Sequence, residues 1–124
     1  MPKKEEWHQV KFMGECALLA YAGDIRYSKI HSIPNGGLRS KITAARMVAE
    51  GARKGVPDIF VPVACHGCHG MYIEFKREIG GVVSKDQKKW KGWLEDEGFA
   101  VVVVYTYEEA LTTLSMYFGE SSGS

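Results

Sequence analysis

The sequence predicts an α/β domain in which a central mixed β-sheet is flanked by layers of helices. Four consecutive valines at positions 101–104 form the continuous apolar run that is typical of a strand covered on both faces. Two further apolar runs, at 59–63 and 71–76, are joined by a short loop that contains two glycines, which favours a pair of strands linked by a hairpin. Helical patterns surround these strands, so the expected order is helix, strand, helix, two strands, helix, strand, helix.

The first half of the chain carries two expected helices and one weak strand. Apolar residues recur at helical spacing over residues 5–21, and the glycine at position 23 ends that helix. A weakly alternating stretch at 29–33 predicts a short strand, and Pro34 and the residues after it force a turn. Ser40 caps a second helix that ends at Gly55. We expect this helix to bury an apolar face formed by Ile42, Ala45, Val48, Ala49 and Ala52.

The second half begins its helices with capping boxes, in which an N-cap side chain and a side chain three residues later satisfy each other's backbone amides. Ser84 and Gln87 form one box, and Thr106 and Glu109 form another. The helix that follows Ser84 is expected to present Trp90, Trp93 and Leu94 to the core. The last helix is expected to run to about residue 118, which gives a single domain over residues 1–119 and a flexible tail at 120–124.

The composition is that of an ordinary globular protein. The 124 residues are 45% hydrophobic and 25% charged, and the net charge of +1 argues against a general polycation that coats DNA. No apolar run approaches the ~20 residues of a membrane span, and the first residues lack the apolar core of a signal peptide. Three cysteines, an odd number, do not indicate a disulfide framework. We therefore expect a cytoplasmic protein.

Asp58, Glu74 and Lys76 form an unusual charged group on two expected strands. Side chains alternate along a strand, so Glu74 and Lys76 share one face, and a hairpin would place Asp58 beside them. Such charges are rarely buried unless they are paired or bind a metal. Mg²⁺ takes one or two carboxylates together with water and phosphate oxygens, and the carbonyl of Phe75 lies between Glu74 and the lysine. A cross-strand salt bridge explains the same spacing equally well, so the residues alone leave both interpretations open.

The loop between these strands contains Cys65, Cys68 and His69 in the spacing of covalent haem attachment, and the same residues could form half of a zinc site. The absence of an export signal disfavours haem, and no second pair of ligands follows for zinc. We therefore interpret the segment as a hairpin loop that carries reactive thiols.

Three segments around the charged group resemble a known family. They are Gly55-Val56-Pro57-Asp58-Ile59-Phe60, His69-Gly70-Met71-Tyr72-Ile73-Glu74-Phe75-Lys76 and Gly80-Gly81-Val82-Val83-Ser84-Lys85-Asp86-Gln87. Together they resemble the VRR-NUC domain, the virus-type replication-repair nuclease branch of the PD-(D/E)XK superfamily, in its stand-alone phage and bacterial form. The similarity extends over roughly residues 5 to 118. It implies the restriction-endonuclease-like core with a mixed sheet between helices.

The resemblance also implies an activity and a set of residues. It implies a Mg²⁺- or Mn²⁺-dependent DNA endonuclease in which Asp58, Glu74 and the Phe75 carbonyl bind the metal. Lys76 would be the catalytic lysine and Gln87 a neighbour of the metal site. The early acidic residue of the family fits Glu5 best, with Glu6 as its rival. Stand-alone members resemble junction-resolving enzymes, which implies a homodimer that acts on branched DNA such as Holliday junctions, in phage recombination, DNA repair or defence.

Basic side chains near these segments are candidates for DNA contacts, because they would neutralise phosphates beside the site. The candidates are Arg39, Arg77, Lys85 and Lys88. A domain that holds DNA on this basic face without cutting it is the main alternative to an enzyme. A protein that binds haem or zinc through the cysteine loop is the second.

Overall fold

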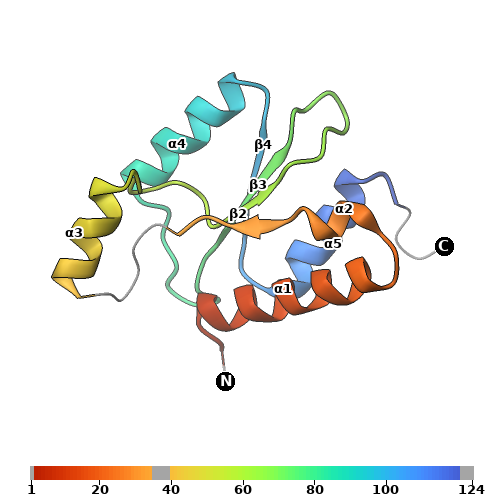
Figure 1. Ribbon diagram of the computed structural model, residues 1–124, viewed down its shortest axis with the longest axis horizontal. Helices are drawn as coiled ribbons and strands as arrows, with labels where there is room; N and C mark the ends of the chain where they lie inside the picture. Colours follow the sequence, from red (N-terminus) through yellow and green to blue (C-terminus); the bar gives the residue numbers. More distant parts are fainter. Residues whose placement is uncertain (1, 35–39, 121–124) are drawn as a thin grey trace.

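The computed structural model describes residues 2–34 and 40–120, and its helices and strands follow the predicted order with one addition (Figure 1). The elements are α1 (Glu5–Tyr21), α2 (Ile25–Ser28), β1 (His31–Ser32), α3 (Lys41–Ala49), β2 (Ile59–Val61), β3 (Met71–Phe75), α4 (Lys85–Asp96), β4 (Ala100–Val104) and α5 (Tyr107–Tyr117). The short helix α2 was not predicted. It begins where the Asp24 side chain accepts the amide of Arg26. No helix within the described residues is long and apolar enough to cross a membrane.

The four strands form one mixed sheet in the order β1-β2-β3-β4. β2 pairs with both β1 and β3 in antiparallel fashion, whereas β3 and β4 are parallel. Ile59 lies opposite Ile73, so the same register continued by one residue places Asp58 opposite Glu74. The hairpin therefore brings together the two carboxylates that the sequence separates by sixteen positions, as predicted.

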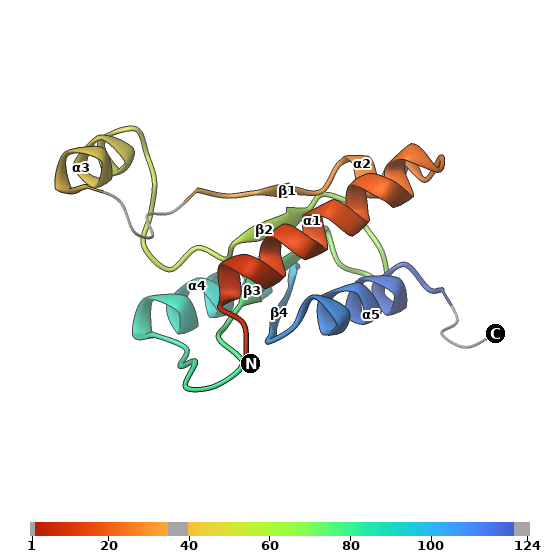
Figure 2. The same cartoon turned by 90° about the horizontal axis from the view of Figure 1, so that it is seen from below.

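The core lies between the sheet and the helices α1 and α5. Phe12 of α1 packs on Phe75 of β3 with ring centroids 5.7 Å apart, and Leu114 of α5 is fully buried in the same cluster. Figure 2 shows α1 and α5 side by side along the sheet, and α4 makes its own contacts with β4. The buried residues Ile73 and Phe75 thus leave the alternate residues Glu74 and Lys76 for the other face of β3.

Helix α3 stands apart from the rest of the fold (Figures 1 and 2). Its start is as predicted, because the Ser40 hydroxyl accepts the amide of Thr43 at 3.1 Å. The prediction of a buried face is wrong: no residue of α3 is buried, and Ile42 is 77% exposed. Helical spacing reports that one face is apolar, but it cannot report whether another element covers that face.

The interior prediction for α4 also needs correction. Trp93 is 52% exposed and packs edge-on against Trp90, which is itself only half-buried. The capping box of this helix is complete, with both Ser84 and Gln87 bonded as predicted. At α5, Thr106 caps the amide of Glu109, but the Glu109 carboxylate accepts the amide of Tyr105 instead of that of Thr106, so only half of the second box forms.

Candidate active site

Asp58 and Glu74 meet where β2 begins and β3 ends. The Asp58 Oδ2 atom accepts the backbone amide of Phe75 at 2.8 Å, which holds this carboxylate across the end of the hairpin. Glu74 is 6% exposed. Burial, followed by the hydrogen bond and charge of Asp58, raises the pKa of Glu74 to about 9. Glu74 is therefore protonated at neutral pH in the metal-free protein, because two carboxylates in contact do not both ionise readily.

Lys76 follows directly and is 8% exposed, an unusual degree of burial for a lysine. Its ammonium group donates to the Oε1 atom of Gln87 at 2.5 Å. The same oxygen accepts the backbone amide of Ser84 at 2.8 Å, which is one half of the capping box. The amide oxygen of Gln87 thus serves the helix cap and holds the lysine at once. Lys76 does not form the cross-strand salt bridge of the alternative interpretation: within the described residues, its nitrogen has no ion pair within 4 Å.

Glu5 approaches this group from the first turn of α1. Burial and the adjacent Glu6 raise the pKa of Glu5, Lys76 acts in the opposite direction, and Asp58 adds to the increase. Glu5 in turn contributes to the raised pKa of Glu74. Glu5 is half-buried and Glu6 is exposed, so the geometry places Glu5, of the two rivals, in electrostatic contact with the carboxylate pair.

The oxygen atoms available to a cation come from these residues and from the backbone of Phe75. The amide of Phe75 points toward Asp58, and the N–H and C=O of one strand residue point to the same edge, so its carbonyl is directed toward Asp58 as well. Among residues 2–34 and 40–120, no group of three or more His, Cys, Asp or Glu side chains is arranged to hold a metal ion. Two carboxylates and a carbonyl still suit Mg²⁺, because this ion retains water and takes its remaining ligands from a phosphate substrate.

The predicted DNA contacts divide into three exposed residues and one that is not placed. Arg77, Lys85 and Lys88 are all exposed and lie just after β3 or in the first turn of α4. Arg77 is close enough to Glu5 to act on its pKa, which puts it at the edge of the carboxylate group. Arg39 lies outside the described residues, together with the glycines at 36 and 37.

The cysteine loop forms the tight hairpin that its glycine and its position between strands predict. Cys65 and Cys68 exchange backbone hydrogen bonds of 3.2 and 2.9 Å. The two residues between them, His66 and Gly67, both have positive φ (51° and 76°), as a two-residue turn of this hand requires. The side chain of His69 lies against Gly98 and Phe99 rather than beside the two thiols.

His8 and Glu78 support the site and were not predicted. The Nδ1 atom of His8 accepts the backbone amide of Tyr107 at 3.0 Å, so the proton is on Nε2, which lies 3.1 Å from a Glu78 carboxylate oxygen. This buried histidine ties α1 to the start of α5 and to the segment that follows Lys76. The contacts span 70 and 99 residues, and no local pattern could have revealed them.

A comparison with solved structures finds the same fold. A structure described as a "VRR_NUC domain protein" superposes with a TM-score of 0.79, covering 96% of this chain and 91% of that chain at 23% sequence identity. No protein-family model and no curated protein matches the sequence. The chain therefore has the fold of a VRR_NUC domain protein, which confirms the predicted fold class.

Proposed function

Given this fold, we propose that the protein is a nuclease, and specifically a Mg²⁺- or Mn²⁺-dependent endonuclease that hydrolyses phosphodiester bonds of DNA. The observation that carries the proposal is the convergence of Asp58, Glu74, Lys76 and Gln87 at one end of the β2–β3 hairpin. A buried Glu74 against a half-buried Asp58, beside a buried lysine held by a neutral amide, is difficult to justify by stability alone, since burying ionisable groups is costly.

In this mechanism Asp58, Glu74 and the Phe75 carbonyl would bind the cation. The bound cation would supply Lewis-acid activation of the scissile phosphate and of water. The side chain of Gln87 keeps the ammonium of Lys76 in place, and that ammonium stabilises the negative charge that develops on the phosphate and orients the attacking water. Glu5 adds a further acidic group at the edge of the site. Arg77, Lys85 and Lys88 are exposed beside the site and neutralise neighbouring phosphates.

The preferred substrate is branched DNA, such as a Holliday junction, and the active species is a homodimer. A two-fold dimer would present two sites to two strands of one junction. Ile42 and Val48 of α3 are both exposed and apolar, and we place the contact with the second copy on this helix. Light scattering at micromolar concentrations tests the dimer, and a monomeric mass throughout would reject it. Cleavage of a panel of junctions, flaps, splayed arms and plain duplex tests the substrate, and equal cutting of plain duplex would count against branch selectivity.

The nuclease activity is tested by cleavage of DNA with and without EDTA. We expect metal-dependent cutting in the wild type and its loss, by roughly 10²-fold or more, in Asp58→Asn, Glu74→Gln and Lys76→Met. Lys29→Met is the matched control for the lysine, because Lys29 is exposed and lies toward the end of β2 that is opposite to Asp58. DNA binding without any cleavage would favour the alternative of a non-catalytic DNA-binding module. Cleavage that survives all three substitutions would reject the site.

A further inference from the structure

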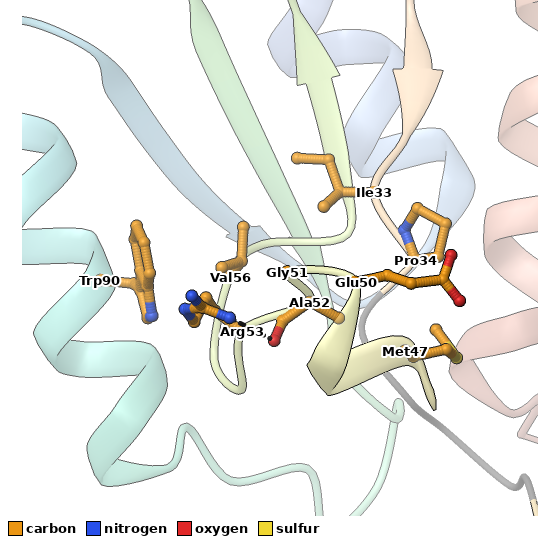
Figure 3. A pocket seen from close by; sticks show the side chains of 9 residues that line it. All are labelled: Ile33, Pro34, Met47, Glu50, Gly51, Ala52, Arg53, Val56 and Trp90. Carbon is orange, nitrogen blue, oxygen red and sulfur yellow. Dashed lines mark hydrogen bonds between the residues drawn. The ribbon is translucent and has the colours of Figure 1, made fainter. Parts of the chain in front are cut away.

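A cavity of about 450 Å³ lies beside the candidate active site and has no role in the proposal above. It is bounded by α4 on one side, by the end of α3 on the other, and by the segment that leads into β2. Figure 3 shows Trp90 on the α4 side and Met47 and Glu50 on the α3 side, with Val56 and Arg53 between them. Its volume falls within the roughly 300–1,000 Å³ of typical small-molecule sites.

Three residues that line the cavity are close neighbours of active-site residues, along the chain or through a backbone hydrogen bond. Val56 precedes Asp58 by two residues, and Trp90 follows Gln87 by one helical turn. Ile33, which also lines the cavity, donates its backbone amide to the carbonyl of Asp58 at 2.7 Å. The cavity and the carboxylate pair therefore adjoin the same segment at the start of β2.

The lining combines a flat aromatic side chain with apolar residues and a polar rim. The half-buried indole of Trp90 faces a cavity that Ile33, Met47 and Val56 make apolar. Glu50 and Arg53 are exposed at its edge and offer an acceptor and a donor. A nucleobase has the matching character, since its faces stack on aromatic rings and its edges form hydrogen bonds.

Positively charged side chains near the cavity suit the phosphate backbone of the nucleic acid that would carry such a base. Arg46, Arg53 and Lys54 are exposed on or just after α3. Lys54 has a partner in Asp86, but the two charges are 3.8 Å apart and the lysine side chain is 88% exposed, so it remains available to a phosphate. Cations of this kind attract the polyanion without reading its sequence.

We propose that this cavity holds one unstacked nucleobase of the DNA strand whose phosphate lies at Asp58 and Glu74. The inference rests on the proposed function for its substrate and adds how that substrate is selected. A base can enter only if it leaves the stack, which costs least at a junction, a flap or an unpaired nucleotide. The cavity thus favours branched over plain duplex DNA through a single displaced base.

The test measures binding in EDTA, where no cleavage occurs. The probes are fluorescein-labelled splayed-arm duplexes in which one nucleotide at a time, near the branch, is replaced by an abasic residue. For the wild type we expect the abasic residue to weaken binding roughly 5- to 100-fold at one or two positions and to have little effect elsewhere. Trp90→Ala should bind every probe equally weakly, whereas Trp90→Phe, which keeps a flat ring, should retain the position dependence.

Tyr21→Ala is the control, because Tyr21 is an exposed aromatic residue at the end of α1 that does not line the cavity. It should keep the wild-type pattern. A uniform response of the wild type to abasic residues, including the absence of measurable binding, would overturn the inference, as would an unchanged pattern in Trp90→Ala. The outcome is separate from that of the nuclease test: cleavage without position-dependent binding rejects the base site alone, and position-dependent binding without cleavage rejects the nuclease alone.

Discussion

The ammonium of Lys76 and the Oε1 atom of Gln87 are 2.5 Å apart, and that same oxygen completes the capping box of α4 through the amide of Ser84. A helix start and a candidate catalytic lysine therefore depend on one atom. The cap restricts the Gln87 side chain to a single orientation, and that orientation presents an acceptor to the end of β3. The same side-chain oxygen therefore caps the helix locally and holds a residue that is distant in the sequence.

Two substitutions at this helix start should separate the two roles. Ser84→Ala removes the hydroxyl that accepts the backbone N–H of Gln87, so we expect the free energy of unfolding to fall by about 1 kcal/mol. Cleavage should change little, because the side chain of Gln87 can still hold Lys76. Gln87→Ala removes the acceptor for Lys76 as well, and should also lower the cleavage rate by roughly 10²-fold. Urea unfolding and single-turnover cleavage measure the two effects. Equal cleavage by both variants would show that Gln87 acts only as a cap.

Stability should decrease with rising pH because of Glu74. Its pKa is about 9 in the folded protein and about 4.5 in the unfolded chain, so the folded state holds a proton that the unfolded state has lost between these values. The stabilising contribution is complete below pH 4.5 and declines toward pH 9, with a slope of at most about 1.4 kcal/mol per pH unit. Glu74→Gln should flatten this profile in metal-free urea unfolding. The exposed Glu95→Gln, whose partner is Lys91, serves as the control, and matching profiles for Glu74→Gln and wild type would refute the raised pKa.

Cation binding should release protons. Glu74 must lose its proton before its carboxylate can bind a metal ion, and its pKa lies near 9, so apparent affinity should rise with pH through the neutral range. Titration calorimetry with Mn²⁺ at pH 7 should be run in two buffers of different ionisation enthalpy. The difference between the two binding enthalpies should correspond to the release of about one proton per ion. Glu74→Gln should weaken binding and remove the difference. Buffer-independent heats in the wild type would contradict a protonated Glu74.

The three cysteines should differ in reactivity. Cys16 is buried in the core, and burial raises the pKa of its thiol to about 12, so it should resist alkylation. Cys65 and Cys68 are half-buried on the hairpin and should react. Mass spectrometry after iodoacetamide treatment should find two adducts in the native protein and three after denaturation. A single native adduct, or modification of Cys16, would contradict the packing described for α1 and the hairpin.

Features with a local cause were predictable from the sequence. The capping box at Ser84, the cap at Ser40 and the hairpin loop that contains Cys65 and Cys68 each depend on residues within a few positions of one another. The hairpin follows from two apolar runs joined by that loop, and its register makes Asp58 the neighbour of Glu74. For these reasons the fold class and the central pair of carboxylates could be anticipated.

Tertiary packing decided the rest, because helical periodicity shows which face of a helix is apolar and not what lies against it. It left α3 without a buried residue and Trp93 exposed, where the sequence predicted core. It half-buried Glu5 near Lys76 and Asp58 and left Glu6 exposed, and through His8 it joined segments up to 99 residues apart. The sequence by itself determined the strands, caps and charged residues of the hairpin. Only the tertiary structure raised the pKa of Glu74 and formed the cavity between α3 and α4, because both depend on which residues distant in the sequence lie side by side.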